Sequence, residues 1–161
     1  MQRRMLAVAA LASLAVAAPV TIAMAATAPN LVFGTVTSQG YPIVIKLSKS
    51  GKLVVRATIG LDLVCQKPPN ITIPDDVTKI AISATGRFSA EQPVTHIPAD
   101  PTTMVPALDV SAKLIGRVNK ARTQIKGTWQ RKIVIYDPAD PSGVAILDTC
   151  DTGVLNFKAT N

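Results

Sequence analysis

The sequence is poor in the residues that most enzyme and metal sites require. It has one histidine, two cysteines and one tryptophan in 161 residues, and aromatic residues make up 4% of the chain. A protein zinc site needs several imidazole or thiolate ligands, so His96 alone predicts no metal centre. There is no Gly-x-Ser-x-Gly nucleophile motif and no phosphate-binding loop. The sequence therefore identifies no catalytic residue, no metal site and no cofactor.

Carboxylates are the remaining groups that could carry chemistry. Beyond residue 26 there is one glutamate, Glu91, and the aspartates occur largely in close pairs. Paired carboxylates hydrolyse glycosides when they are held at set separations. However, Asp137 and Asp140 each precede a proline and Asp151 opens an Asp-Thr-Gly sequence, which are usual turn patterns. A carboxylate-dependent hydrolase is therefore the weakest of the functions considered.

Residues 1–26 predict a cleaved secretory signal peptide. Arg3 and Arg4 supply a positive start, residues 5–18 are apolar, and residues 23–25 match the small-x-small cleavage pattern. Pro19 argues against an uncleaved anchor, and the twin arginine leaves a twin-arginine export route open. No later run is apolar enough to span a membrane. We expect no transmembrane segment in the mature chain and a secreted, periplasmic or cell-envelope location.

The two cysteines, Cys65 and Cys150, both lie in the mature chain and are 85 residues apart. An even number of cysteines in an exported protein predicts a disulfide. In the chain-entropy description, closing a loop of this length stabilises the fold by roughly 4–5 kcal/mol. The alternative is two free, buried thiols.

The mature chain favours strands over helices. Val, Ile and Thr account for 42 of residues 27–161, with one Glu and one Met, and β-branched residues suit a pleated sheet. Apolar and polar residues alternate through 42–48 and 53–65, which predicts a hairpin. Further strands are predicted over 31–37, 79–84, 125–136, 143–149 and 153–159. Residues 107–119 alternate as a strand does, although their spacing after Pro106 would also suit a short helix.

About eight short strands predict a single all-β domain over 27–161, an antiparallel sandwich or barrel. The proline-rich stretch 91–106 is expected to cross from one sheet to the other, with His96 as an exposed loop residue. Arg131 falls on the apolar face of its predicted strand. That position predicts a bulge or a place at the rim of a barrel.

Charge is the one feature that stands out. Residues 27–161 carry a net charge of +5, and residues 113–132 hold seven Lys and Arg with no acidic residue between Asp109 and Asp137. If 108–118 and 122–136 form a hairpin, five of these side chains could share its solvent face. The anion-contact candidates are Lys113, Arg117, Arg122, Lys126 and Lys132. The alternative is a solvated face that protects a sheet edge.

Three functional hypotheses follow. The first is an exported, non-catalytic β-sandwich domain that acts by surface contact with an anionic cell-envelope polymer or glycan. The second is a small secreted protease inhibitor that presents 91–106 as a rigid loop, and the third is the hydrolase. Nucleic acid is not an expected partner, because the chain is exported and only Trp129 and Tyr136 lie nearby for base stacking.

Overall fold

The computed structural model describes residues 31–100, 102–140 and 142–161, so the predicted signal peptide lies outside the described residues. Every regular element in the described part of the chain is a β-strand. The strands are β1 (Val32–Val36), β2 (Pro42–Leu47), β3 (Leu53–Cys65), β4 (Ile71–Ala81), β5 (Arg87–Ile97), β6 (Leu108–Val118), β7 (Gln124–Tyr136), β8 (Ile146–Asp151) and β9 (Leu155–Thr160).

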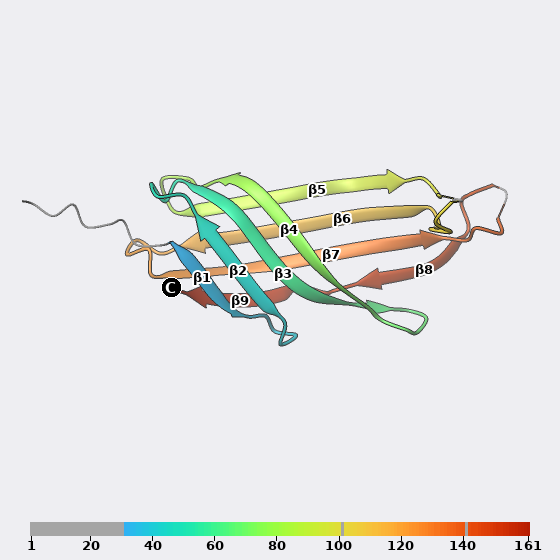
Figure 1. Ribbon diagram of the computed structural model, residues 1–161, viewed down its shortest axis with the longest axis horizontal. Helices are drawn as coiled ribbons and strands as arrows, with labels where there is room; N and C mark the ends of the chain where they lie inside the picture. The colour runs from blue at the N-terminus through green and yellow to red at the C-terminus, as the bar shows by residue number, and fades with distance from the viewer. Residues whose placement is uncertain (1–30, 101, 141) are drawn as a thin grey trace, which may run out of the picture.

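The strands form one antiparallel sheet that closes on itself. They pair in the order β4-β3-β2-β1-β9-β7-β6-β5, and β8 bridges β3 and β7. A six-strand barrel of β1, β2, β3, β8, β7 and β9 results, with β4 added beside β3 and β6 and β5 beside β7. In Figure 1 the layer β1–β4 crosses the longer layer β5–β9. The all-β, antiparallel prediction is confirmed, but the strands are not all short, since β3 and β7 each have 13 residues.

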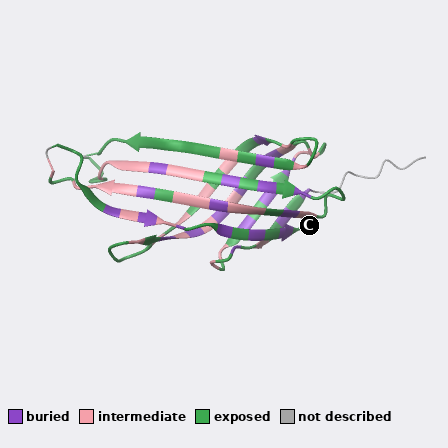
Figure 2. Cartoon of the chain, turned by 180° about the vertical axis from the view of Figure 1, so that it is seen from behind, coloured by how far each residue is buried: buried purple, intermediate pink, exposed green. Residues whose placement is uncertain are grey.

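The core lies between these two layers and follows the alternation along each strand. Ile59, Leu61 and Leu63 of β3 are fully buried, and so are Ile125 and Trp129 of β7. Buried and exposed residues alternate along most strands (Figure 2). The period-2 pattern of the sequence therefore selects which face of each strand points inward.

Two glycines let aromatic rings pack against the sheet in this core. Gly116 of β6 and Gly127 of β7 are cross-strand partners, and their outer neighbours in the same row are Phe88 and Phe157. A Cβ at Gly116 would lie 2.2 Å from the Phe88 ring, and one at Gly127 would lie 2.5 Å from the Phe157 ring. The rings cover the two glycines and fill the space that side chains would otherwise take.

The ambiguous segment 107–119 is a strand, β6. The strand predicted over 79–84 is longer and earlier than expected, because β4 begins at Ile71. The first half of β4 was not predicted because it contains Pro74, Asp75 and Asp76, and proline and aspartate are rare in strands. Proline is tolerated here because, in the described chain, β3 is the only strand paired with β4.

The prediction that residues 91–106 cross between sheets is wrong. Residues 87–97 form β5, which pairs with β6 and has a register shift between Gln92 and Thr95 that accommodates Pro93. The residues described after β5, 98–100 and 102–107, lead into β6 of the same hairpin. The turn at 82–86 instead carries the chain from one layer to the other, from β4 to β5.

Arg131 needs neither a bulge nor a rim position. The β6–β7 register runs without a shift through the pair Ala112 and Arg131. Its side chain enters the space between the layers, where a guanidinium nitrogen donates to the Asp75 carboxylate of β4 at 2.5 Å. A charged partner on the opposite layer therefore compensates the inward charge.

Candidate functional site

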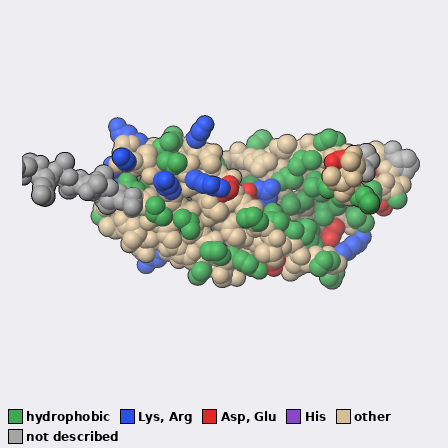
Figure 3. Space-filling view, viewed as in Figure 1, with side chains coloured by type: hydrophobic (Ala, Val, Ile, Leu, Met, Phe, Trp, Pro, Cys, Tyr) green, Lys and Arg blue, Asp and Glu red, His purple; other side chains and the backbone are tan. Residues whose placement is uncertain are grey.

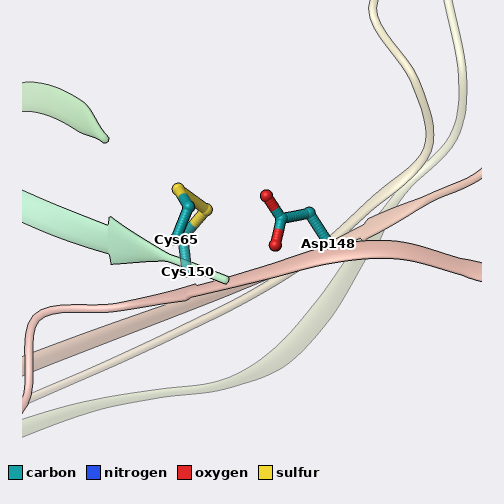
Figure 4. Close-up of side chains that lie close together, drawn as sticks. All are labelled: Cys65, Asp148 and Cys150. Atoms are coloured by element: carbon teal, nitrogen blue, oxygen red, sulfur yellow. A yellow bond between two sulfur atoms is a disulfide. The ribbon is translucent and has the colours of Figure 1, made fainter. Parts of the chain in front are cut away.

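The disulfide predicted between Cys65 and Cys150 is present. The two residues are cross-strand partners in β3 and β8, so the bond lies where β8 closes the barrel. Asp148 lies beside it, largely buried, and its carboxylate accepts hydrogen bonds from the backbone N–H groups of Lys67 and Thr149 (Figure 4). Because the two sulfurs are bonded to each other, they do not offer thiolates to a metal ion.

All five predicted anion-contact residues are exposed, but the structure divides them. Arg117 and Lys126 are direct cross-strand partners on β6 and β7. The Lys113 ammonium is 3.2 Å from the Glu91 carboxylate, which offsets its charge. Lys132 lies six residues further along β7, about 20 Å from Lys126, and opposite Asp151 of β8. The five residues therefore do not form one continuous surface.

A row of four cations crosses the sheet at Arg117 and Lys126. Arg87 of β5 is paired with Arg117, and Lys158 of β9 is paired with Lys126. All four side chains are exposed on the outer face. Neighbouring strands are about 4.8 Å apart, so the row spans about 14 Å. We call Arg87, Arg117, Lys126 and Lys158 the cationic row; its like charges, directly opposed, repel one another.

The cationic row borders a hollow at the end of the barrel, of about 940 Å³. Its walls come from the turns at 48–52, 82–86 and 119–123. The basic side chains that line it are Lys52, Arg117, Lys120, Arg122 and Lys126, and none of its lining residues is acidic. We call it the basic hollow.

The turns that build the basic hollow are specified by local chemistry. Gly51 and Gly86 have positive φ angles, which glycine adopts without steric cost. The Asn119 side-chain oxygen accepts hydrogen bonds from the backbone N–H groups of Thr123 and Gln124, at 2.8 and 3.1 Å. The Arg122 guanidinium lies over Gly51, where a Cβ would be 2.7 Å from its central carbon. The turns thus hold Arg122 across the hollow.

Positive charge dominates this end of the barrel. Residues 46–61, 82–90, 110–136 and 152–161 contain no Asp or Glu. In Figure 3, Lys and Arg side chains gather toward the end where β6 and β9 finish. The end can therefore attract and hold negatively charged groups.

Sequence reasoning did not select four members of this surface as anion contacts: Lys52, Arg87, Lys120 and Lys158. Lys158 alternates with Phe157 and Ala159 in a predicted strand, so its outward direction could be deduced from the sequence. Arg87 and Lys52 carry no such signal. Their place beside Arg117 and the hollow depends on which strands are neighbours.

His96 belongs to a polar cluster at the other end of the outer face. It is the cross-strand partner of Asp109, and its Nδ1 is 2.8 Å from one carboxylate oxygen. Tyr136 donates its hydroxyl to the other oxygen at 2.7 Å. The hydrogen bonds from Tyr136 and then His96 lower the pKa of Asp109. The hydrogen bond between Tyr136 and Asp109 also raises the pKa of Tyr136. Asp109 is thus held as a carboxylate that joins three strands, and His96 is an exposed strand residue rather than a loop residue.

The aspartate pairs considered for hydrolysis have structural partners. Asp75 and Asp76 point to opposite faces of β4 and each binds an arginine, Arg131 and Arg56 respectively. Asp140 accepts hydrogen bonds from Ser142, Val144 and Ala145, which organise its turn and lower its pKa. The segment 91–106, considered as the loop of an inhibitor, is not a single loop, since residues 91–97 are part of β5.

No protein-family model, curated protein or solved structure matches the chain. In the part of the chain that the structure describes, no helix is long and apolar enough to cross a membrane. A function for this chain therefore has to be inferred from its own residues and their arrangement.

Proposed function

We propose that the mature protein is a non-catalytic binding domain for a linear anionic polymer of the cell envelope, such as an acidic glycan or a phosphate-containing polymer. The observation that carries this proposal is the cationic row, which leads into the basic hollow. The predicted leader and the disulfide support an exported location, because disulfides persist in oxidising compartments.

A linear polymer fits the row better than a single small anion does. The four residues lie in a row across four strands whose backbones are about 4.8 Å apart. A chain with repeated negative charges can contact them in turn. Such a chain also relieves the repulsion between directly opposed cations. Arg117 and Lys126 belong to both the row and the hollow, so one bound polymer can contact both.

The binding should be moderate and sensitive to salt. Exposed ion contacts contribute roughly 0.2–1 kcal/mol each, so three of them account for about 0.6–3 kcal/mol. A difference of about 1.4 kcal/mol is tenfold in affinity. Charges at a surface are screened over about 8 Å at physiological ionic strength. We expect affinity to fall steeply as salt increases.

The test compares two variants that lose the same number of positive charges. The row variant is Arg117→Ser/Lys126→Ser/Lys158→Ser, and the control is Lys46→Ser/Lys67→Ser/Lys132→Ser, all at exposed positions outside the row. Affinity for polygalacturonate and for inorganic polyphosphate is measured by calorimetry across a salt series, with thermal unfolding to confirm that both variants fold. The row variant should bind about tenfold more weakly than the control or worse.

An equal loss of affinity in the two variants would show that net charge alone drives binding, and the proposal would be wrong. No binding of either polymer by the unmodified protein at low salt would also overturn it. Preference for one polymer would identify the chemistry of the repeating anion.

A further inference from the structure

The end of the molecule opposite the basic hollow exposes apolar side chains on two adjacent loops. The described residues of the first loop, between β5 and β6, are 98–100 and 102–107, and those of the second, between β7 and β8, are 137–140 and 142–145. The N–H of Tyr136, the last residue of β7, donates to the Ala107 carbonyl of the first loop. Met104 is 89% exposed and Val144 is 72% exposed. Figure 3 shows hydrophobic side chains gathered toward this end. Ile97, Met104, Val105, Val144 and Ile146 form what we call the tip.

The charged side chains of the two loops that carry the tip are acidic. They are Asp100, Asp137 and Asp140, and the sequence of the two loops contains no Lys or Arg. Hydrogen bonds from Thr103 and Thr102 lower the pKa of Asp100, and those from Ser142 and Ala145 lower that of Asp140. These aspartates therefore stay ionised at neutral and mildly acidic pH. The molecule has a negative, apolar end and a positive, hollow end.

We propose that the tip of one copy docks into the basic hollow of a second copy, so that molecules associate head to tail. The charges of the two surfaces are complementary, which favours this partner and orientation. The hollow also offers apolar contact, since Ile82, Ala84 and Val118 are among its lining residues. An anionic membrane is a poorer occupant for the tip, because its surface charge would repel Asp100, Asp137 and Asp140.

Docking of two different surfaces has a consequence for the size of the assembly. A heterologous contact that does not close into a ring continues into an open chain of copies. The tip offers five apolar side chains, fewer than the roughly 20–30 residues that each side of a stable interface contributes. We therefore expect association only at high protein concentration.

The test uses one variant for each surface. The tip variant is Met104→Asn/Val144→Ser, with asparagine chosen because Met104 has a positive φ angle. The hollow variant is Lys52→Glu/Lys120→Glu, which leaves the cationic row intact. Controls outside both surfaces are Val36→Ser/Val44→Ser, at exposed valines, and Lys46→Glu/Lys67→Glu. Thermal unfolding confirms that each variant folds.

Sedimentation equilibrium from the micromolar to the millimolar range gives the readout. The weight-average mass of the unmodified protein and of both controls should rise past twice that of a single copy, less so at high salt. Each surface variant alone should stay monomeric. An equimolar mixture of the two variants should form dimers and stop there, because one intact tip and one intact hollow remain.

Two outcomes would overturn the proposal. One is a monomeric unmodified protein at millimolar concentration. The other is association that the tip variant abolishes and the hollow variant does not, which would indicate a symmetric tip-to-tip contact. The polymer-binding proposal is judged separately, since the tip variant retains the whole cationic row and its affinity for polyphosphate can be measured on the monomer.

Discussion

Asp75 of β4 and Arg131 of β7 form an ion pair across the interior, although their strands are not hydrogen-bonded neighbours. Their side chains are 13% and 16% exposed, respectively. A charge this far from water is costly unless it is paired. The pair therefore connects the two layers between β4 and β7, which no backbone ladder joins.

Removing one member of this pair should destabilise the fold more than removing both. Arg131→Met leaves the Asp75 carboxylate buried without a partner, and we expect a loss of about 3 kcal/mol in the free energy of unfolding. In Asp75→Leu/Arg131→Met, most of that loss should be regained, because apolar groups replace the pair. Urea unfolding measures both, and a double variant less stable than Arg131→Met would contradict this account.

A side chain at Gly116 should not be tolerated. Gly116→Ala places a methyl group 2.2 Å from the Phe88 ring, and overpacking of this kind costs about 1–3 kcal/mol. Gly34→Ala is the matched control, since a Cβ there meets no atom within 4 Å in the described structure. Thermal unfolding should show a lower midpoint for Gly116→Ala only. Equal midpoints would mean that the ring moves aside freely.

Loss of the disulfide should lower stability strongly. It joins residues separated by 85 positions, and releasing a loop of that length costs roughly 4–5 kcal/mol in the chain-entropy description. Cys65→Ser/Cys150→Ser should therefore have a much lower melting temperature than the unmodified protein. Adding a reductant should lower the melting temperature of the unmodified protein and leave that of the variant unchanged. Two alkylatable thiols in the native protein would refute the bond itself.

Asp76 should titrate at an unusually low pH. Hydrogen bonds from Arg56 and then Thr58 lower its pKa from 3.8 to about 2. Because the folded-state pKa is depressed, its contribution to stability is complete above the ordinary pKa and is lost as pH falls toward 2. Carbon-13 NMR of the carboxyl groups should give a midpoint near 2, and Arg56→Gln should raise it toward 3.8. A midpoint unaffected by Arg56→Gln would exclude the arginine as the cause.

Most strands were predictable because each has one buried face. The hairpin 42–48 and 53–65 and the strand 107–119 alternate over enough residues to show the period of two. The first half of β4 and the strand β5 were not predictable in this way. Pro74 and Pro93 resemble turn signals, and only the finding that β4 and β5 lie at sheet edges explains why the strands accept them.

The candidate surface was predictable in part for the same reason. Arg117 and Lys126 lie on neighbouring strands of one hairpin, so their register follows from the local sequence. Arg87 and Lys158 join them from β5 and β9, which are distant in sequence. The neutralisation of Lys113 by Glu91 likewise depends on the β5–β6 pairing, so the charges that remain uncompensated could not be identified beforehand.

The sequence by itself determined the all-β character, the inward and outward faces of most strands, and the disulfide, since composition, alternation and an even cysteine count are properties of the chain. Only the tertiary structure decided how these strands close into a barrel, that Arg131 points inward to Asp75, and that the basic hollow and the tip lie at opposite ends. Those features depend on which distant strands become neighbours, and such neighbours are selected by burial of the whole core rather than by any one segment.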